Sequence, residues 1–286
     1  RQMCIRDRVK NSGTPQAAFF SYKIEGLTPS TTYTIWVEVF DKAGNKAKYP
    51  EKTFTTAKKE ETKTEGLNTS HYIVLTTKKA VGEKIELDIY AFDEYKAGVW
   101  VDLNGNGKWD EGIDEKPTEF NRKIKYTLQA QRIRIYGIVR NMKCPKNQLT
   151  EVDISHTPAL TRLYAAENNL PSIAHLEDIE ELSIDSHTLL ASSLPEGLTE
   201  LIVRETTPLT TINTSLFTEL RILDIDNCKN LKSLDLSKNE KLTNLSVYNT
   251  GLTTLDLSNQ PNLRILYADF NPLTKLNVAG NRALQY

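Results

Sequence analysis

Oxygen-bearing side chains recur at alternate positions in the segment DLNGNGKWDEGID, residues 102–114. Asp102, Asn104 and Asn106 come first, and Gly107 follows where a tight loop needs a sharp bend. Hard oxygen ligands at this spacing are typical of loops that bind calcium. The sequence therefore predicts one structural calcium ion in this loop. Its candidate ligands are Asp102, Asn104, Asn106, the carbonyl of Lys108, Asp110, Glu111 and Asp114.

The match to a complete calcium-binding loop is partial. The twelfth position of such loops carries an acid that binds the ion through both carboxylate oxygens, and here that position is Ile113. Glu111 or Asp114 would have to take its place. The competing interpretation is an Asn/Gly-rich hairpin turn whose carboxylates bind nothing, and the sequence favours neither. Because no nucleophile or base accompanies the loop, an ion here would be structural.

Short alternating segments surround this loop and would have to hold it. Apolar residues alternate with the period of half-buried β-strands at residues 72–75, 85–91, 99–101 and 124–128. We therefore expect residues 70–136 to form a β-rich unit. This unit leads directly into a repeated segment, and we expect it to cap the N-terminal end of that array, where a stack of leucines would otherwise meet water.

Residues 137–286 repeat the pattern LxxLxL followed by a polar residue. Each turn of such an array buries its apolar side chains only against its neighbours, so the pattern predicts a leucine-rich repeat solenoid with an elongated surface. Asn147, Asn168 and Asn271 lie where a side-chain amide can bond the bending backbone. The repeats start at Val139, Leu160, Ile179, Leu198, Leu220, Leu242, Leu263 and Leu284, and a second series interleaves at Leu149, Leu170, Leu189, Leu209, Leu231, Leu252 and Leu273.

The residues that flank the central leucine of each strand are expected to face solvent on the concave side of the solenoid. Tyr and Arg are enriched at interface hot spots, which favours a surface that contacts a protein or a glycan. The competing interpretation is that strands simply favour Tyr and Ile. Both stay open for Tyr248 and Tyr267, which lie on adjacent turns. The candidate binding residues are Tyr164, Ile202, Arg204, Ile222, Asp224, Asp226, Tyr248, Ile265, Tyr267 and Asp269.

Residues 9–57 have a different pattern. Residues 33–39 alternate as one strand, and a turn and a returning strand follow. The stretch IEGLTPSTTYTIWVEVFDKAGN, with Leu27, Pro29 and Tyr33 in a tyrosine-corner pattern, resembles the second half of a fibronectin type III domain. The resemblance implies a partial β-sandwich that acts as a spacer or a binding unit.

The ends and the linker have compositions of their own. Residues 58–69 contain the charged run KKEETKTE, which predicts a linker, with a charged docking site as the alternative. Residues 1–8, RQMCIRDR, look like translated adapter sequence or a disordered terminus, so we interpret them as non-native and expect no regular structure there. The last residues stop inside a repeat without a polar cap. We therefore expect this chain to be truncated at Tyr286 and the natural array to be longer.

Composition excludes several classes of protein. The 286 residues carry 36 basic and 37 acidic side chains, and this net charge of −1 argues against binding nucleic acid. No apolar run approaches about 20 residues, so we expect no transmembrane segment. The four histidines show no metal-ligand spacing or nucleophile motif, and we expect no enzyme. Cys144 and Cys228 fall four turns apart, roughly 19 Å at about 4.8 Å per strand, too far for a disulfide. We interpret them as buried thiols.

The order of the segments VWVDLNGNGKWDEG, IRIYGIV and MKCPKNQLTEVDIS, followed by the repeats, resembles bacterial cell-surface leucine-rich repeat proteins with internalin-J-like repeats. Those repeats often place Cys at the last strand position. Cys144 matches that position, but a thiol ladder is not preserved, because later turns carry Ala165, Ile184, Val203, Ile225, Val247 and Ala268 there. The resemblance implies a secreted or surface-anchored bacterial protein, extracellular, that acts in recognition or adhesion without catalysis. The alternative is a structural stalk or spacer that displays another domain of a longer protein.

Overall fold

The computed structural model describes residues 2–8, 32–40, 45–48, 51–55, 67–204 and 209–285. The chain divides into two compact units, residues 1–63 and 64–286. Most of the fibronectin-like segment, including Leu27 and Pro29, lies outside the described residues, and so does most of the expected linker. Within that linker, Asn68 is buried and its carbonyl accepts a hydrogen bond from the Trp100 indole N–H at 3.2 Å, so it packs with the second unit.

The first unit contains one described sheet. The long strand β2 (Thr32–Phe40) pairs antiparallel with β3 (Lys46–Lys48) and β4 (Lys52–Thr55), and the register shifts by one residue between the two pairings. The predicted strand and returning strand are therefore both present, and Tyr33 is buried as its pattern suggests.

The expectation of no regular structure in residues 1–8 is wrong. Gln2–Arg8 form β1, which pairs parallel with β2 from Gln2 opposite Thr34 to Arg8 opposite Phe40. The physical reason is the open edge of β2. An unpaired strand edge presents a row of N–H and C=O groups that any extended segment can bond, whatever its side chains are.

The second unit begins with two groups of antiparallel strands, a four-stranded sheet and a strand pair that belongs to a larger sheet described below. One has the strand order β11 (Leu149–His156), β5 (Tyr72–Thr77), β9 (Arg132–Tyr136) and β7 (Trp100–Asp102). The other pairs β6 (Lys84–Tyr90) with β8 (Lys123–Thr127), and the short helix α1 (Asp93–Lys96) follows β6. The buried sides of both sheets belong to one apolar core, to which β5 contributes Ile73 and Leu75 and β6 contributes Ile85 and Leu87.

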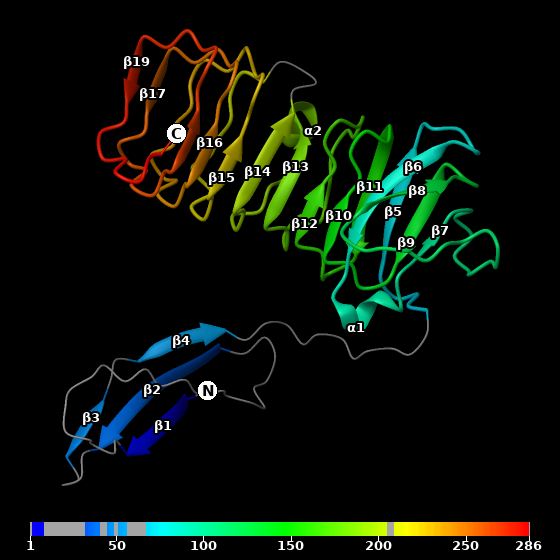
Figure 1. The fold of residues 1–286 in the computed structure, drawn as a ribbon, viewed down its shortest axis with the longest axis horizontal. Helices are drawn as coiled ribbons and strands as arrows, with labels where there is room; N and C mark the ends of the chain where they lie inside the picture. The colour runs from blue at the N-terminus through cyan, green and yellow to red at the C-terminus, as the bar shows by residue number, and fades with distance from the viewer. Residues whose placement is uncertain are drawn as a thin grey trace. The chain divides into compact units, whose positions relative to one another are not determined.

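A parallel ladder of short strands follows and confirms the repeat solenoid (Figure 1). The central residues stand opposite one another from turn to turn, Leu163 opposite Leu182, then Leu201, Leu223, Leu245 and Leu266, as the sequence register predicts. The strands are β10 (Asn141–Lys143), β12 (Arg162–Tyr164), β13 (Glu181–Asp185), β14 (Glu200–Arg204), β15 (Ile222–Asp224), β16 (Asn244–Ser246) and β18 (Ile265–Tyr267).

The return side of the solenoid is less regular. It contains the parallel pair β17 (Thr254–Asp256) and β19 (Lys275–Asn277), in which Leu255 lies opposite Leu276. One turn instead forms the helix α2 (Ser186–Ala191), in the region where the repeat pattern is shortest and least regular. The apolar core nevertheless runs through every turn from Val139 to Leu263, because each turn contributes its leucines to the same column.

The repeats and the preceding unit share one sheet. Strand β6 pairs antiparallel with β10, so β8 and β6 extend the parallel ladder into a nine-stranded sheet that ends with β18. The side-chain amide of Asn147 adds two bonds across this junction, since it accepts the Glu86 N–H at 3.0 Å and donates to the Glu86 carbonyl at 2.7 Å. The first turn is therefore fixed to the unit that holds residues 102–114.

Asparagine side chains form hydrogen bonds that connect consecutive turns. The Asn168 oxygen accepts the N–H groups of Asn147 and Leu149, while its nitrogen donates to the carbonyls of Cys144 and Ala165. Asn271 repeats this arrangement near the C-terminal end of the array. Its oxygen accepts the Thr250 N–H, and its nitrogen donates to the carbonyls of Val247 and Ala268. The predicted backbone role of these amides is confirmed.

Candidate functional site

The side chains that flank the central leucines lie on the solvent side of the nine-stranded sheet. We call this surface the strand face. It is formed by the outward residues of β10, β12 to β16 and β18 and by the residues that directly follow these strands. Its candidate residues from Tyr164 to Asp269 are half-buried or exposed, whereas the central residues of the strands are buried as far as Leu245. Burial alternates in this way along β12, β14, β15 and β16, whereas in β13 the flanking residues Ser183 and Asp185 are buried as well.

The N-terminal part of the strand face is a closed polar cluster around Tyr164. Its hydroxyl donates to Glu181 at 2.5 Å and lies 3.4 Å from an oxygen of Glu200. Arg162 lies 3.0 Å from Glu181, and the Lys143 ammonium lies 5.2 Å from the centre of the Tyr164 ring. Burial, followed by the bond to Glu181, raises the pKa of Tyr164, so the ring stays a neutral phenol.

Two carboxylates stand side by side in this cluster, because Glu181 and Glu200 are register partners on adjacent strands. Burial raises the pKa of Glu200, and the nearby negative charge of Glu181 raises it further. The hydrogen bond from Tyr164 and the charges of Arg162 and Lys143 act in the opposite direction. The charged groups of this cluster therefore interact mainly with one another.

The middle of the strand face carries a paired arginine. Arg204 makes two contacts of 3.0 Å with Asp224, one to each carboxylate oxygen. Burial is the largest single effect and works against the charged guanidinium. The hydrogen bond to Asp224 and the negative charges of Asp224, Asp226 and Glu167 together outweigh it, so the pKa of Arg204 is raised. Bidentate pairs of this kind are geometrically specific. Half-buried Ile202 and Ile222 lie beside this pair. The charged groups of Arg204 and Asp224 are therefore already paired with each other in the middle of the strand face.

The C-terminal part of the strand face is different, because its aromatic rings are open to solvent. Tyr248 is 36% exposed, Tyr267 is 53% exposed and Phe270 is 75% exposed. Tyr248 and Phe270 meet edge to face, with ring centres 5.1 Å apart. Half-buried Ile265 and exposed Asp269 complete this part of the strand face.

Sequence reasoning missed Phe270, which is the most exposed ring of the three. It follows Asp269 directly, at the position that Asn227 and Asn249 occupy in the two preceding turns, and all three have positive φ angles between 53° and 65°. Asn tolerates this left-handed conformation and Phe rarely adopts it. The signal that was available is this replacement of a repeated Asn by an aromatic residue.

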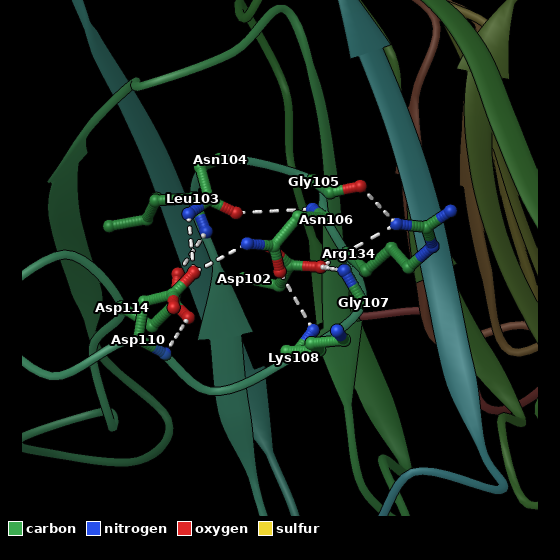
Figure 2. A network of polar contacts seen from close by, with 10 residues as sticks. All are labelled: Asp102, Leu103, Asn104, Gly105, Asn106, Gly107, Lys108, Asp110, Asp114 and Arg134. Atoms are coloured by element: carbon green, nitrogen blue, oxygen red, sulfur yellow. Dashed lines mark hydrogen bonds and ion pairs between the residues drawn. The ribbon is translucent and has the colours of Figure 1, made fainter.

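Residues 102–114 form a compact loop that is closed by its own hydrogen bonds (Figure 2). Asp102 is fully buried, and its two oxygens accept the backbone N–H groups of Asn106 at 3.2 Å and of Gly107 at 2.8 Å. The guanidinium of Arg134 lies 3.5 Å from Asp102 and donates to the Gly105 carbonyl at 2.5 Å. The loop is thus anchored to β9 through Arg134.

The other two carboxylates close the second half of the loop. One oxygen of Asp110 accepts the side-chain amides of Asn104 at 2.7 Å and Asn106 at 2.5 Å, and these bonds lower the pKa of Asp110. Asp114 accepts the backbone N–H groups of Leu103 at 2.9 Å and Asp110 at 2.7 Å. Burial nevertheless raises the pKa of Asp114.

The oxygen atoms of these residues are ligands of the kind that calcium prefers, but in this arrangement the carboxylates accept hydrogen bonds from N–H groups. The amides of Asn104 and Asn106 offer nitrogen to Asp110 instead of offering oxygen to an ion, and Glu111 accepts the Trp109 indole N–H at 3.2 Å. Within the described ranges, no group of three or more His, Cys, Asp or Glu side chains is placed to hold a metal ion. Coordination would require both amides to turn over.

One histidine lies beside a serine, but the serine hydroxyl donates its hydrogen bond to another residue and not to the histidine. Ser155 Oγ lies 2.8 Å from His156 Nδ1 and donates its only proton to Asp153 at 2.6 Å. A serine nucleophile would have to give that proton to the histidine. His156 also stacks on Tyr72, with ring centres 4.4 Å apart, which accounts for its placement.

Comparisons with known proteins add little. No family model matches the chain, and no curated protein matches it either. Among solved structures, the functional domain of InlJ from Listeria monocytogenes, described as including a cysteine ladder, is 22% identical at a TM-score of 0.24. The match covers 50% of this chain and 51% of that chain, so the chain spans about half the length of that domain. The fold is therefore assigned from the strand register above and not from this likeness.

Two further observations bear on the cysteines and on membranes. Among the described residues, Cys144 and Cys228 form no disulfide, and both are buried. In the later turns the position of Cys144 holds apolar side chains such as Ala165 and Ile184, which are also buried. In the described part of the chain, no helix has the length and apolar character needed to cross a membrane.

Proposed function

We propose that this protein is a recognition or adhesion module that binds a protein or glycan through its strand face, on or outside a bacterial cell. The observation that carries the proposal is the exposure of Tyr248, Tyr267 and Phe270 on adjacent turns of one sheet. Large rings that remain open to water on a rigid scaffold are typical of the anchors of binding interfaces.

The scaffold supports binding with little rearrangement. Each strand of the face is held in a parallel ladder, and the amides of Asn168 and Asn271 fix the turns that follow the strands. A surface that is ordered before a partner arrives loses less conformational entropy on binding. In this proposal the unit of residues 70–136 caps the array, which agrees with the pairing of β6 and β10. The fibronectin-like segment serves as a spacer.

We propose binding and not catalysis for the described residues. The tyrosine and carboxylate pairs of the N-terminal cluster are engaged with one another, and the proton of Ser155 is directed to Asp153 and away from His156. These contacts leave the described strand face as a surface of rings and charges.

We also propose one structural calcium ion for the loop of residues 102–114. The support is its set of oxygen-bearing side chains, above all Asp102, Asp110 and Asp114, within one short loop. Asn104 and Asn106 would hold the ion with them, and the ion would stiffen the loop without taking part in any reaction.

The alternative function is a structural stalk, and one experiment separates the two. The full chain is tested for binding to host-cell surfaces, extracellular proteins and glycans beside a Tyr248→Ala/Tyr267→Ala variant, with Leu190→Ala as a control for an exposed side chain elsewhere. Recognition predicts that binding is lost in the double variant while the melting temperature stays unchanged. Absence of binding by the folded parent, or binding that survives the double variant, contradicts recognition through this face and favours the stalk.

A further inference from the structure

Tyr248 lies between two carboxylates at the C-terminal end of the strand face. Because Leu223, Leu245 and Leu266 are register partners, Asp226, Tyr248 and Asp269 occupy equivalent positions beyond these leucines on three consecutive turns. Backbone bonds continue this alignment past the strands, since Asn227 donates to the Tyr248 carbonyl at 2.8 Å and Asn249 donates to the Asp269 carbonyl at 2.9 Å. Stacked strands lie about 4.8 Å apart, so Asp226 and Asp269 are the residues directly before and after Tyr248 in this row.

These two carboxylates retain acceptor capacity. One oxygen of Asp226 accepts the Ser246 hydroxyl at 2.6 Å and the Tyr248 N–H at 2.9 Å, and no described residue donates to the other oxygen. Exposed Asp269 receives no side-chain hydrogen bond or ion pair from the described residues. The nearest basic residue of the same row, Arg204, is held by both oxygens of Asp224 and also interacts with the charge of Asp226, so one positive charge faces Asp224, Asp226 and Asp269. This end of the strand face is therefore left negative.

The aromatic rings at this end face solvent and are not needed by the core. Phe270 is three-quarters exposed, packs edge to face on Tyr248, and occupies a left-handed backbone position that Asn fills in the two preceding turns. A bulky residue in this conformation is less favourable for the fold than Asn. Its presence is better explained by an outward contact, in the sense that strained positions concentrate at functional sites.

We propose that the surface of Tyr248, Tyr267 and Phe270 with Asp226 and Asp269 binds a basic side chain, arginine or lysine, of a protein partner. The proposal rests on the proposed function, in which the strand face is the recognition surface. Aromatic faces attract cations, and carboxylates beside them accept charge-assisted hydrogen bonds from the same group. The two carboxylates would repel an acidic glycan, and a neutral glycan would gain nothing from their charge.

The test uses the full chain and a short acetylated, amidated peptide in which arginine alternates with glycine. A second peptide replaces each arginine with glutamine. Binding is measured by titration calorimetry to the parent, Tyr248→Ala, Asp269→Asn and an Asp226→Asn/Asp269→Asn variant. The matched control is Glu240→Gln, which removes one exposed carboxylate from the same region of the chain but not from the strand face. Thermal melts establish that each variant is folded.

We expect the arginine peptide to bind the parent and the control equally. Tyr248→Ala and Asp269→Asn should each weaken binding about threefold to fivefold, as expected for cation–π contacts and exposed charge pairs. Raised salt should weaken it further. Equal binding of the glutamine peptide, or unchanged affinity in the folded variants, overturns the proposal.

The outcome is separable from that of the proposed function. If a surface or matrix ligand is lost by Tyr248→Ala/Tyr267→Ala but retained by Asp226→Asn/Asp269→Asn, the strand face is a recognition surface and the inference of a basic partner group is wrong. A neutral oligosaccharide that behaves in this way would identify the partner as a glycan.

Discussion

The side chain of Asn147 satisfies both backbone hydrogen-bonding groups of Glu86. Its oxygen accepts the Glu86 N–H at 3.0 Å and its nitrogen donates to the Glu86 carbonyl at 2.7 Å, as a neighbouring strand would. Asn147 itself is fully buried, and its own N–H is bonded by Asn168. Asn147 therefore joins the first turn of the solenoid to the preceding unit through its side chain and to the next turn through its backbone N–H.

Replacement of Asn147 tests the importance of this junction. Asn147→Ala should lower the free energy of unfolding by about 1–3 kcal/mol, because two partly buried backbone groups of Glu86 lose their partner. Chemical denaturation measures the change. Asn262→Ala is the matched control, since that amide makes one exposed bond of 3.2 Å to Glu240. Equal, small effects of the two substitutions would show that the junction carries little of the stability.

Two glycines with opposite surroundings test the tightness of the turns. A Cβ atom on Gly251 would lie 2.3 Å from the Lys229 carbonyl oxygen, whereas one on Gly197 would meet nothing within 4 Å. Gly251→Ala should therefore destabilise the protein by about 1–3 kcal/mol, in the range of overpacking. Gly197→Ala should leave the melting temperature within a few degrees. A neutral Gly251→Ala would mean that successive turns are not packed as described.

The carboxylate pair on the strand face predicts a pH dependence. Burial and Glu181 raise the pKa of Glu200 in the folded protein, so the folded state holds its proton more tightly than the unfolded state does. Stability from this group is therefore present below the usual glutamate pKa and is lost as pH rises through the raised folded pKa. Glu200→Gln should remove this loss.

The measurement is the difference in unfolding free energy between Glu200→Gln and the parent, taken in urea at pH 4 and at pH 7. The variant should gain relative to the parent as the pH rises. Glu219→Gln, which removes a carboxylate paired with Lys241 at the surface, should show no such gain. A parallel pH profile for the parent and Glu200→Gln would contradict the assignment.

The calcium proposal predicts a linked change in stability. A folded site held at one hundred times its dissociation constant would be stabilised by about 2.7 kcal/mol, so calcium should raise the melting temperature of the parent. Asp110→Asn should abolish the rise, and the emission of Trp109, whose indole bonds Glu111, should report binding. If calcium leaves both observables unchanged in the folded parent, the loop is closed by Arg134 and its amides alone.

The two buried cysteines should be unreactive in the native protein. Burial raises the pKa of Cys144 to about 12, so the thiolate that attacks a disulfide reagent is almost absent at pH 8. In a Cys4→Ser background, Cys144 and Cys228 should be modified only when denaturant is added. Rapid modification without denaturant would mean that the solenoid opens locally around them.

The register of the solenoid followed from the sequence because it depends on a one-dimensional period. Leu163 and Leu182 could be aligned by counting, and the hydrogen bonds of the strands then follow. The second row of buried amides was missed, because it mixes residue types: Asn239, Gln260 and Asn281 each donate to carbonyls of the preceding turn. A repeat in which Gln replaces Asn is hidden from a search for identical residues.

The individual side-chain contacts of the strand face could not be predicted from the repeat period. The candidates Arg204 and Asp224 prove to hold each other, and Tyr164 is engaged by Glu181. Such pairing depends on side-chain directions across strands that are far apart in the sequence. The same holds for the loop of residues 102–114, whose donor Arg134 lies outside the motif.

The antiparallel pairing of β6 with β10 marks the point at which the nine-stranded sheet changes from antiparallel to parallel strands. The strands β10, β12 to β16 and β18 all run in one direction, so each turn presents the same kind of edge to the next one. A duplicated turn placed between β15 and β16 would therefore find matching neighbours on both sides and would lengthen the face by about 4.8 Å. Gene duplication could change the reach of this surface in unit steps, while the fixed start of the array stays as it is.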